Sequence, residues 1–146
     1  MDPYVKATTS WLVLNLETRR LVRDPKLMED NTVCTENVME KSADKVRMPR
    51  GVVPELVMEH VVAYSDVDMN GHTNNAMYMQ WAMDAVDYKV ASSMPVKEVT
   101  INFNHETKHG EKVEIYRVSQ EGEDGLNVFV EGKVEEQSAF CVKMTF

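Results

Sequence analysis

Residues 74–91, NNAMYMQWAMDAVDYKVA, carry the clearest helical pattern of this 146-residue chain. One face has apolar side chains at the three- and four-residue spacing of a helix, at Met79, Ala82, Met83, Val86 and Val90. The opposite side is also largely apolar, with Ala76, Tyr78, Trp81 and Ala85. A helix that is apolar almost all round has to be buried by other elements. The stretch therefore predicts one long central helix that the rest of the domain surrounds.

The segments on either side of this helix have the pattern of strands. A valine-rich strand is predicted at 56–68, and four more at 96–106, 112–121, 126–136 and 138–146. In the second of these strands, apolar and polar residues alternate as in a half-buried antiparallel strand. One buried helix followed by such a meander predicts an α+β domain of the hot-dog type, in which an antiparallel β-sheet is wrapped around the helix.

The N-terminal part of the chain is expected to differ from this domain. Residues 7–23 read as strand, turn and strand, and the first run is apolar on both faces, which predicts a buried strand. Residues 26–50 are polar and poorly periodic, so that a linker and one or two short helices both remain open.

Composition argues against several classes of function. The net charge of −8 does not favour nucleic-acid binding, and no apolar run is long enough to predict a membrane span. The N-terminus lacks the pattern of a signal peptide, and Cys34 and Cys141 follow no metal spacing, so we expect reduced thiols and a cytoplasmic location. His105 and His109 fall on a strand and a turn, which would not bring them to one face, and neither a metal nor another cofactor is expected.

The polar stretch YSDVDMNGHTNN at 64–75 lies where the helix should begin. Thr73 or Asn70 could cap the helix, but a cap needs one polar residue and this stretch holds several. The first amides of a buried helix also carry positive dipole character, which would stabilise the oxyanion that forms when a carbonyl is attacked.

The side chains of this stretch suit hydrolysis. Asp68 offers a carboxylate, Asn70 an amide donor and acceptor, and His72 a group that can transfer a proton near neutral pH. Gly71 would allow a ligand to approach the backbone closely. Taken singly, each residue also has a structural explanation as a turn or edge residue, and only their combination favours an active site.

The eleven methionines of the chain allow two interpretations. Methionine is an adaptable filler of hydrophobic cores, and it also makes a compliant wall for a flexible apolar ligand. Met79 and Met83 on the central helix are the candidates for such a wall, with core packing as the alternative.

The residues YSDVDMNGHTNNAMYMQWAMDAV at 64–86 resemble the signature of acyl-ACP thioesterases, which release fatty acids from acyl carrier protein. The stretch ATTSWLVLNLETRRLVR at 7–23 resembles the segment that closes the first of that family's two hot-dog repeats. The resemblance implies that Asp68, Asn70 and His72 belong to an active site. The positive dipole at the helix start separately makes the backbone near Gly71 and His72 the expected oxyanion donor.

The resemblance also aligns FNHET at 103–107 with the family segment that supplies a glutamate, so Glu106 is implied as the fourth site residue. Thr107 stands where a cysteine is common in that family, which leaves water as the expected nucleophile. Strict alternation along 96–106 would point Glu106 away from the helix, unless a bulge intervenes or the strand ends before it.

Because family members carry two repeats, this chain resembles a C-terminal half. The expected organisation is remnant strands of a preceding repeat at 1–25, a linker at 26–54 and a hot-dog domain at 55–146, with a homodimer replacing the absent repeat. The expected partner is acyl carrier protein, although this chain and acyl carrier proteins are both acidic. A basic patch could offset the repulsion, or the arginines could only form a solvated face; the candidates are Arg19, Arg20 and Arg23, or Arg47 and Arg50. The alternatives are a hot-dog acyl-CoA thioesterase, an enoyl-thioester hydratase, and a truncated half that binds acyl chains without turnover.

Overall fold

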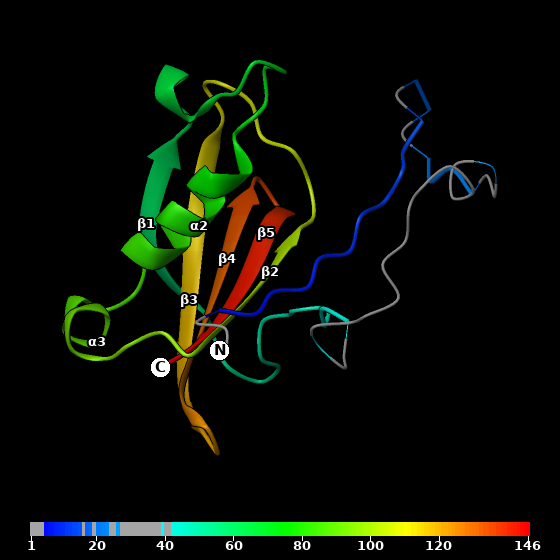
Figure 1. The fold of residues 1–146 in the computed structure, drawn as a ribbon. Coiled ribbons are helices and arrows are strands. Elements are labelled where there is room, and N and C mark those ends of the chain that lie inside the picture. Colours follow the sequence, from blue (N-terminus) through cyan, green and yellow to red (C-terminus); the bar gives the residue numbers. More distant parts are fainter. Residues whose placement is uncertain (1–4, 16, 19, 24–25, 27–38, 40–41) are drawn as a thin grey trace. The chain divides into compact units, whose positions relative to one another are not determined.

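The computed structural model describes residues 5–15, 17–18, 20–23, 26, 39 and 42–146 (Figure 1). The chain divides into two units, residues 1–44 and 45–146, and the second begins inside the segment predicted as a linker. The second unit contains β1 (Glu55–Val61), a 3₁₀ turn η1 (Tyr64–Asp66), α2 (Asn75–Asp84), α3 (Tyr88–Ser93), β2 (Glu98–Phe103), β3 (Lys112–Gly122), β4 (Gly125–Val134) and β5 (Gln137–Thr145).

The five strands form one antiparallel sheet in the order β1-β3-β4-β5-β2. Helix α2 packs against β4 and β5 at the middle of this sheet, as Figure 1 shows. The connection from β1 through η1 to the start of α2, and the connection from β2 to β3, both lie at the same end of the sheet. The predicted α+β arrangement of an antiparallel sheet around a helix is confirmed, and this end of the sheet carries the predicted site.

The central helix is shorter than its sequence pattern predicts, because the stretch 74–91 forms two helices. Helix α2 ends at Asp84, and the carbonyl of Ala85 accepts a hydrogen bond of 2.9 Å from Arg117 Nη1 of β3. Asp87 then caps α3, since its side chain accepts the N–H of Lys89 at 2.8 Å. Aspartate competes for backbone amides in this way and favours helix starts over helix interiors, which explains the break.

The core lies between α2 and the sheet. Ala82 and Ala85 are buried and allow the helix to approach the strands closely, while Tyr78, Trp81 and Phe140 fill the remaining space. The Tyr78 and Trp81 rings meet edge to face at 5.4 Å between centroids, and Tyr78 lies 5.1 Å from Phe140. Edge-to-face and offset aromatic pairs are favourable arrangements, so these rings fix the helix on the sheet.

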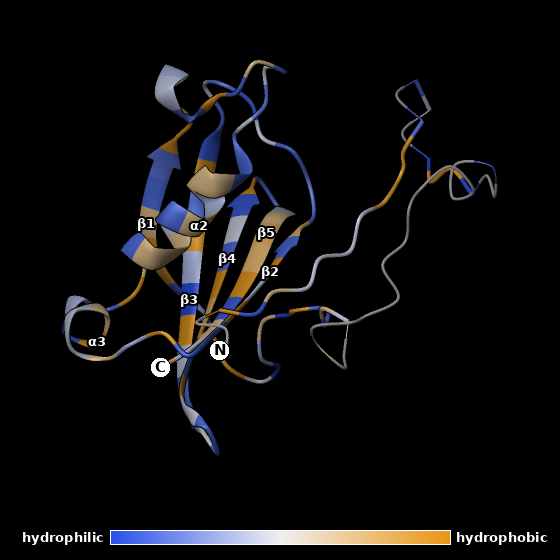
Figure 2. Ribbon diagram, in the orientation of Figure 1, coloured by the Kyte–Doolittle hydropathy of each residue, from blue (hydrophilic) through white to orange (hydrophobic). Residues whose placement is uncertain are grey.

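Strand β5 is buried on both of its faces. Phe140, Val142 and Met144 belong to the core, whereas Cys141 is buried on the opposite face. Figure 2 shows the result as hydrophobic colouring over most of β5, in contrast to the alternation along β4. Burial and the nearby charge of Glu131 raise the pKa of Cys141 to about 12, with the Val142 N–H opposing them, so this thiol stays protonated. Cys34 lies outside the described residues.

The N-terminal unit contains the predicted turn, but the side chains described around it are exposed, apart from the half-buried Val22. Val13 accepts the N–H of Val22, and a single antiparallel bridge joins Leu14 and Leu21. The prediction of a buried strand is wrong for these residues, because Trp11 is 85% exposed and its apolar neighbours are exposed as well.

Candidate functional site

The polar stretch before α2 folds into a tight loop whose two ends are tied together. Val67 and Thr73 form an antiparallel bridge, and the Asp68 N–H donates to the carbonyl of His72 at 2.9 Å. The loop turns at Gly71, whose φ of +78° is favourable only for glycine. A Cβ atom at Gly71 would meet nothing within 4 Å, so the backbone angle, and not close packing, requires the glycine.

Asp68 holds Asn70 in this loop. One carboxylate oxygen of Asp68 accepts the Asn70 N–H at 2.8 Å, and the other lies 3.4 Å from the Asn70 amide nitrogen, Nδ2. These contacts leave the Asn70 side chain exposed at the tip of the loop. The role of Asp68 in orienting Asn70 for a reaction stays a prediction.

The backbone amides of the loop are partly engaged. The Gly71 N–H donates to the carbonyl of Asp68 at 3.0 Å, and the Thr73 and Asn74 N–H groups donate to Thr107 and Asp66. Of the two predicted backbone donors, Gly71 is thus occupied by a bond within the loop. Within the residues that the structure describes, the His72 N–H has no such bond, which makes it the better candidate for an oxyanion donor.

The helix begins one residue later than predicted, and its cap is neither Thr73 nor Asn70. Asn74 is the N-cap, and its side chain accepts the Ala76 N–H at 2.9 Å. Thr73 is buried and bonded elsewhere, while Asn70 lies at the loop tip. Asn70 is therefore not required for the helix start, and it remains exposed for another role.

Glu106 lies beside His72 because β2 ends before it. The last residue of β2 is Phe103, after which the N–H groups of Asn104 and His105 both donate to the carbonyl of Ala139. The chain turns at this point, so the strict alternation that would point Glu106 away from the helix does not apply. Glu106 Oε1 lies 3.4 Å from His72 Nε2, and both side chains remain about 30% exposed, at 29% and 31%. The structure thus brings two predicted site residues into contact from two separate loops.

Buried hydroxyl groups join these two loops directly behind the contact. Thr73 Oγ1 and Thr107 Oγ1 are 2.6 Å apart, and Tyr78 of α2 places its hydroxyl 3.0 Å from Thr107 Oγ1. The Thr107 N–H donates to the same tyrosine oxygen, and the Thr73 N–H donates to the Thr107 carbonyl. Sequence reasoning noticed Thr107 only as a departure from a cysteine and missed this network, because the partners are far apart in the chain.

A second buried contact supports the loop from the other side. Asp66 is buried, and one of its carboxylate oxygens lies 2.7 Å from His60 Nε2 of β1 and accepts the Ala63 N–H at 2.7 Å. Burial alone would raise the pKa of Asp66, but the His60 hydrogen bond, the Ala63 N–H and the charge of His60 together lower it. The one signal for this contact in the sequence is an aspartate six residues after a histidine.

The two methionines proposed for an acyl-binding wall pack against the core. Met79 and Met83 of α2 are half-buried and contact the buried cluster between helix and sheet. This position is consistent with core packing, and it leaves part of each side chain at the surface. A role in acyl binding therefore stays a prediction.

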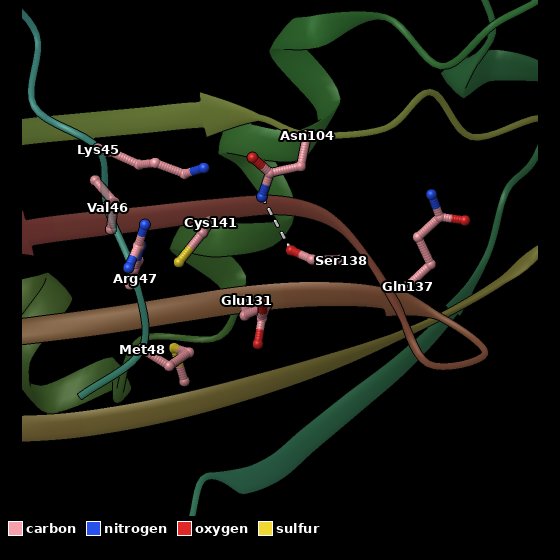
Figure 3. Close-up of a pocket in the computed structure, with 9 residues that line it drawn as sticks. All are labelled: Lys45, Val46, Arg47, Met48, Asn104, Glu131, Gln137, Ser138 and Cys141. Atoms are coloured by element: carbon pink, nitrogen blue, oxygen red, sulfur yellow. Dashed lines mark hydrogen bonds between the residues drawn. The ribbon is translucent and has the colours of Figure 1, made fainter. Parts of the chain in front are cut away.

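A pocket of about 490 Å³ lies on the opposite face of the sheet from α2 (Figure 3). Residues 45–48 pass over β4 and β5 there, and the Val46 N–H donates to the Asn102 side chain. The Asn104 amide donates to Ser138 at the rim, as the dashed line shows. The pocket's lining includes none of Asp68, Asn70, His72 and Glu106. It is separate from the His72–Glu106 contact.

Neither a metal cluster nor a long apolar helix is present in the described part of the chain. No group of three or more His, Cys, Asp and Glu side chains there could hold a metal ion. None of its helices has the length and apolarity that crossing a membrane requires.

Comparison with known proteins assigns the family. The sequence profile of the acyl-ACP thioesterase C-terminal domain matches residues 54–145. The chain belongs to the acyl-ACP thioesterase family. Every predicted site residue lies within the part of this acyl-ACP thioesterase domain that the profile matches.

Two plant acyl-ACP thioesterases that are similar in sequence are longer than this acyl-ACP thioesterase chain. It is 27% identical over 121 residues to a chloroplastic palmitoyl-acyl carrier protein thioesterase of Arabidopsis thaliana. This alignment covers 72% of this chain and 27% of the relative. It is 25% identical over 138 residues to a chloroplastic oleoyl-acyl carrier protein thioesterase of Coriandrum sativum, covering 82% of this chain and 35% of the relative. The chain therefore spans about a quarter to a third of these relatives.

Solved structures confirm the hot-dog fold of the acyl-ACP thioesterase domain. The structure of the 12:0-ACP thioesterase from Umbellularia californica matches with a TM-score of 0.75 at 18% identity, over 90% of this chain and 50% of that one. An acyl-ACP thioesterase from Bacteroides thetaiotaomicron matches with a TM-score of 0.70 at 19% identity, over 91% and 52% of the two chains. At these identities the likeness concerns the fold.

Proposed function

We propose that this protein is a thioester hydrolase that releases free fatty acid from acyl carrier protein. Family membership supports the reaction class, and the contact between His72 and Glu106 is the observation that carries the proposal for this chain. An acidic and a basic group from two loops meet there, in a half-exposed position that a substrate could reach. General acid–base catalysis needs this combination of contact and access.

In the proposed reaction, Glu106 and His72 remove a proton from a water molecule whose oxygen attacks the thioester carbonyl carbon. The C–S bond then breaks, and the leaving thiolate takes up the proton to give the free thiol beside the fatty acid. Asn70, held by Asp68, and the His72 N–H supply hydrogen bonds to the oxyanion. Donors of this kind lower the barrier because negative charge develops on the carbonyl oxygen only as the reaction proceeds.

The proposal extends to the assembly and the setting of the enzyme. We expect a cytoplasmic homodimer in which a second copy stands beside the first, and acyl carrier protein as the partner that delivers the acyl chain. Arg47 and Arg50 are exposed and remain candidates for contacts with an acidic carrier, whereas Arg19 lies outside the described residues.

A thiol-release assay with acyl-ACP and acyl-CoA substrates of several chain lengths tests this function. Because one oxyanion donor contributes roughly a hundredfold to turnover, Asn70→Ala should reduce the rate by about that factor, and Glu106→Gln should reduce it at least as much. Gln80→Ala and Glu121→Gln remove an exposed amide and an exposed carboxyl elsewhere, and both should retain the wild-type rate. A common background rate for the wild type, Asn70→Ala and Glu106→Gln would refute the proposal.

A second candidate is a non-catalytic domain that binds acyl chains. The match covers 27% and 35% of the two plant relatives described above, so it does not by itself carry their activity over to this chain. Binding of a fluorescent fatty acid without thiol release from either carrier would identify this alternative. Release of thiol from acyl-CoA alone would instead indicate an acyl-CoA thioesterase. Hydration of an enoyl thioester without thiol release would indicate a hydratase.

A further inference from the structure

The two proposed catalytic side chains are each followed directly by a buried threonine. Thr73 comes after His72, and Thr107 comes after Glu106. The hydroxyls of these two threonines are 2.6 Å apart, and the Thr73 N–H donates to the Thr107 carbonyl at 2.8 Å. Backbone and side chain therefore join the two loops at the position next to the His72–Glu106 contact.

Tyr78 connects the same pair of loops to the helix. Its hydroxyl lies 3.0 Å from Thr107 Oγ1 and accepts the Thr107 N–H at 3.0 Å. The Tyr78 ring is fixed in the core by Trp81 and Phe140. Tyr78 therefore links Thr107, and with it the preceding residue Glu106, to the core of the domain.

These hydroxyls are shielded from water. Thr107, Tyr78 and Thr73 are exposed by only 0%, 2% and 4%. Hydrogen bonds in such surroundings are stronger than at the surface, and a buried hydroxyl that loses its partner carries an unmet desolvation cost. The contact between the loops is therefore held in one arrangement, while the exposed faces of His72 and Glu106 stay accessible.

We infer that Thr73, Thr107 and Tyr78 form a hydroxyl clamp that sets the distance between His72 and Glu106, so that Thr107 is a positioning residue of the proposed reaction. This inference rests on the proposed function. A fully buried hydroxyl with two hydroxyl partners has no access to a substrate carbonyl, so Thr107 acts through Glu106 and not as a nucleophile. The threonine in the place of the family's common cysteine thereby gains a physical explanation.

Substitutions at Thr107 test the clamp in the thiol-release assay. Thr107→Val keeps the shape of the side chain but removes the hydroxyl, and it should lower kcat by about tenfold to a hundredfold, because small misplacements of reacting groups have effects of this size. Thr107→Ser restores the hydroxyl and should recover most of kcat. Thr145→Val is the matched control. It removes the buried hydroxyl of Thr145, which lies at the far end of β5 and donates to Asn127 of β4, and it should leave kcat unchanged.

A double variant separates positioning from a general loss of structure. If Thr107 acts by placing Glu106, Thr107→Val should have little further effect on the rate in the Glu106→Gln background. Equal losses from Thr107→Val in both backgrounds would overturn the inference. Tyr78→Phe removes the third hydroxyl with the ring retained and should show the same pattern. It replaces Thr107→Val in this test if Thr107→Val fails to fold.

Nuclear magnetic resonance tests the clamp without any activity. The side-chain nitrogen signals of His72 should change on Glu106→Gln in the wild-type background, since the two groups are in contact. In the Thr107→Val background, Glu106→Gln should change the His72 signals much less. In the Thr145→Val background, it should change them as strongly as in the wild type. An unchanged response in Thr107→Val would refute the clamp, whereas absence of thiol release in the wild type would refute only the proposed function.

Discussion

The hydrogen bond between His60 and the buried Asp66 shows how single residues hold the loop that precedes α2. The Asp66 carboxylate binds His60 of β1, while its backbone carbonyl accepts the N–H of Asn74, the cap of α2. The His60 ring also lies 4.5 Å from the Trp81 ring. One aspartate therefore connects a strand, the helix start and the loop that carries Asp68.

Replacement of this aspartate should destabilise the protein in a pH-dependent way. The pKa of Asp66 is lowered in the folded state from its ordinary value of 3.8. Its contribution is therefore present above the unfolded pKa and is lost as the pH falls through the folded pKa. We expect Asp66→Asn to reduce the free energy of unfolding by about 1.5–3 kcal/mol at neutral pH, since a charged partner is removed from a buried hydrogen bond. Urea unfolding at pH values above and below 3.8 measures this difference.

An exposed aspartate provides the control for this measurement. Asp84 lies at the exposed end of α2, so Asp84→Asn should change the stability little at any pH. The difference between Asp66→Asn and the wild type should shrink in acid. A difference that persists unchanged at the lowest pH would show that the carboxylate charge is not what Asp66 contributes.

At the level of elements, β4 and β5 fit together because a glycine of β4 lies opposite a phenylalanine ring of β5. Gly132 is paired with Phe140, and the register shifts at Gly132 and Lys133. A Cβ atom at Gly132 would lie 2.1 Å from Cε1 of the Phe140 ring. The ring thus occupies the space that a side chain on β4 would need, and it reaches Tyr78 from there.

Gly132→Ala should therefore be poorly tolerated. The added methyl group forces the Phe140 ring or the strand to move, and overpacking of this kind costs about 1–3 kcal/mol. Gly122→Ala is the comparison, because its Cβ would meet the end of the half-buried Asn127 side chain, which can move at the cost of its hydrogen bond with Thr145 and not of core packing. Thermal unfolding of the two variants compares the sites. Equal melting temperatures would mean that β4 relaxes without disturbing the core.

At the scale of the molecule, the two edges of the sheet differ in chemistry. The edge strand β1 has exposed apolar side chains at Leu56 and Val61, but it also carries Glu55 and Glu59, which form ion pairs of 2.7 and 2.8 Å with Arg117 and Lys112 of β3. The opposite edge, β2, presents the exposed apolar side chains of Val99 and Phe103. Charged edge strands resist pairing, whereas apolar ones favour it, so β2 is the better edge for contact with a second copy.

The proposed homodimer can be tested at these edges. We expect a mass in solution of twice the chain's 16.7 kDa by light scattering. Val99→Lys on β2 should shift the mass to that of the monomer, because a lysine at an edge opposes strand pairing. Val61→Lys makes the same change on β1, where the valine is also exposed, and should leave the dimer intact. A monomeric wild type, or a monomer from Val61→Lys alone, would contradict the expectation.

The order and type of the elements followed from local patterns. Alternation, valine-rich runs and turn glycines predicted all five strands of the sheet to within a few residues at most ends, and only the first was much shorter than expected. The apolar face at 74–91 predicted a buried helix, because helical spacing is a local property. The break after Asp84 was missed, since it depends on which backbone amides Asp87 binds.

The sequence by itself determined the fold class and the chemical types of the site residues, because periodicity and a specific motif are both written in consecutive positions. Tertiary structure decided which of these residues meet: the end of β2 at Phe103 turns Glu106 toward His72, and buried hydroxyls from two loops and the helix hold them there. Contacts between residues more than thirty positions apart depend on how strands and loops pack, and no local pattern encodes them.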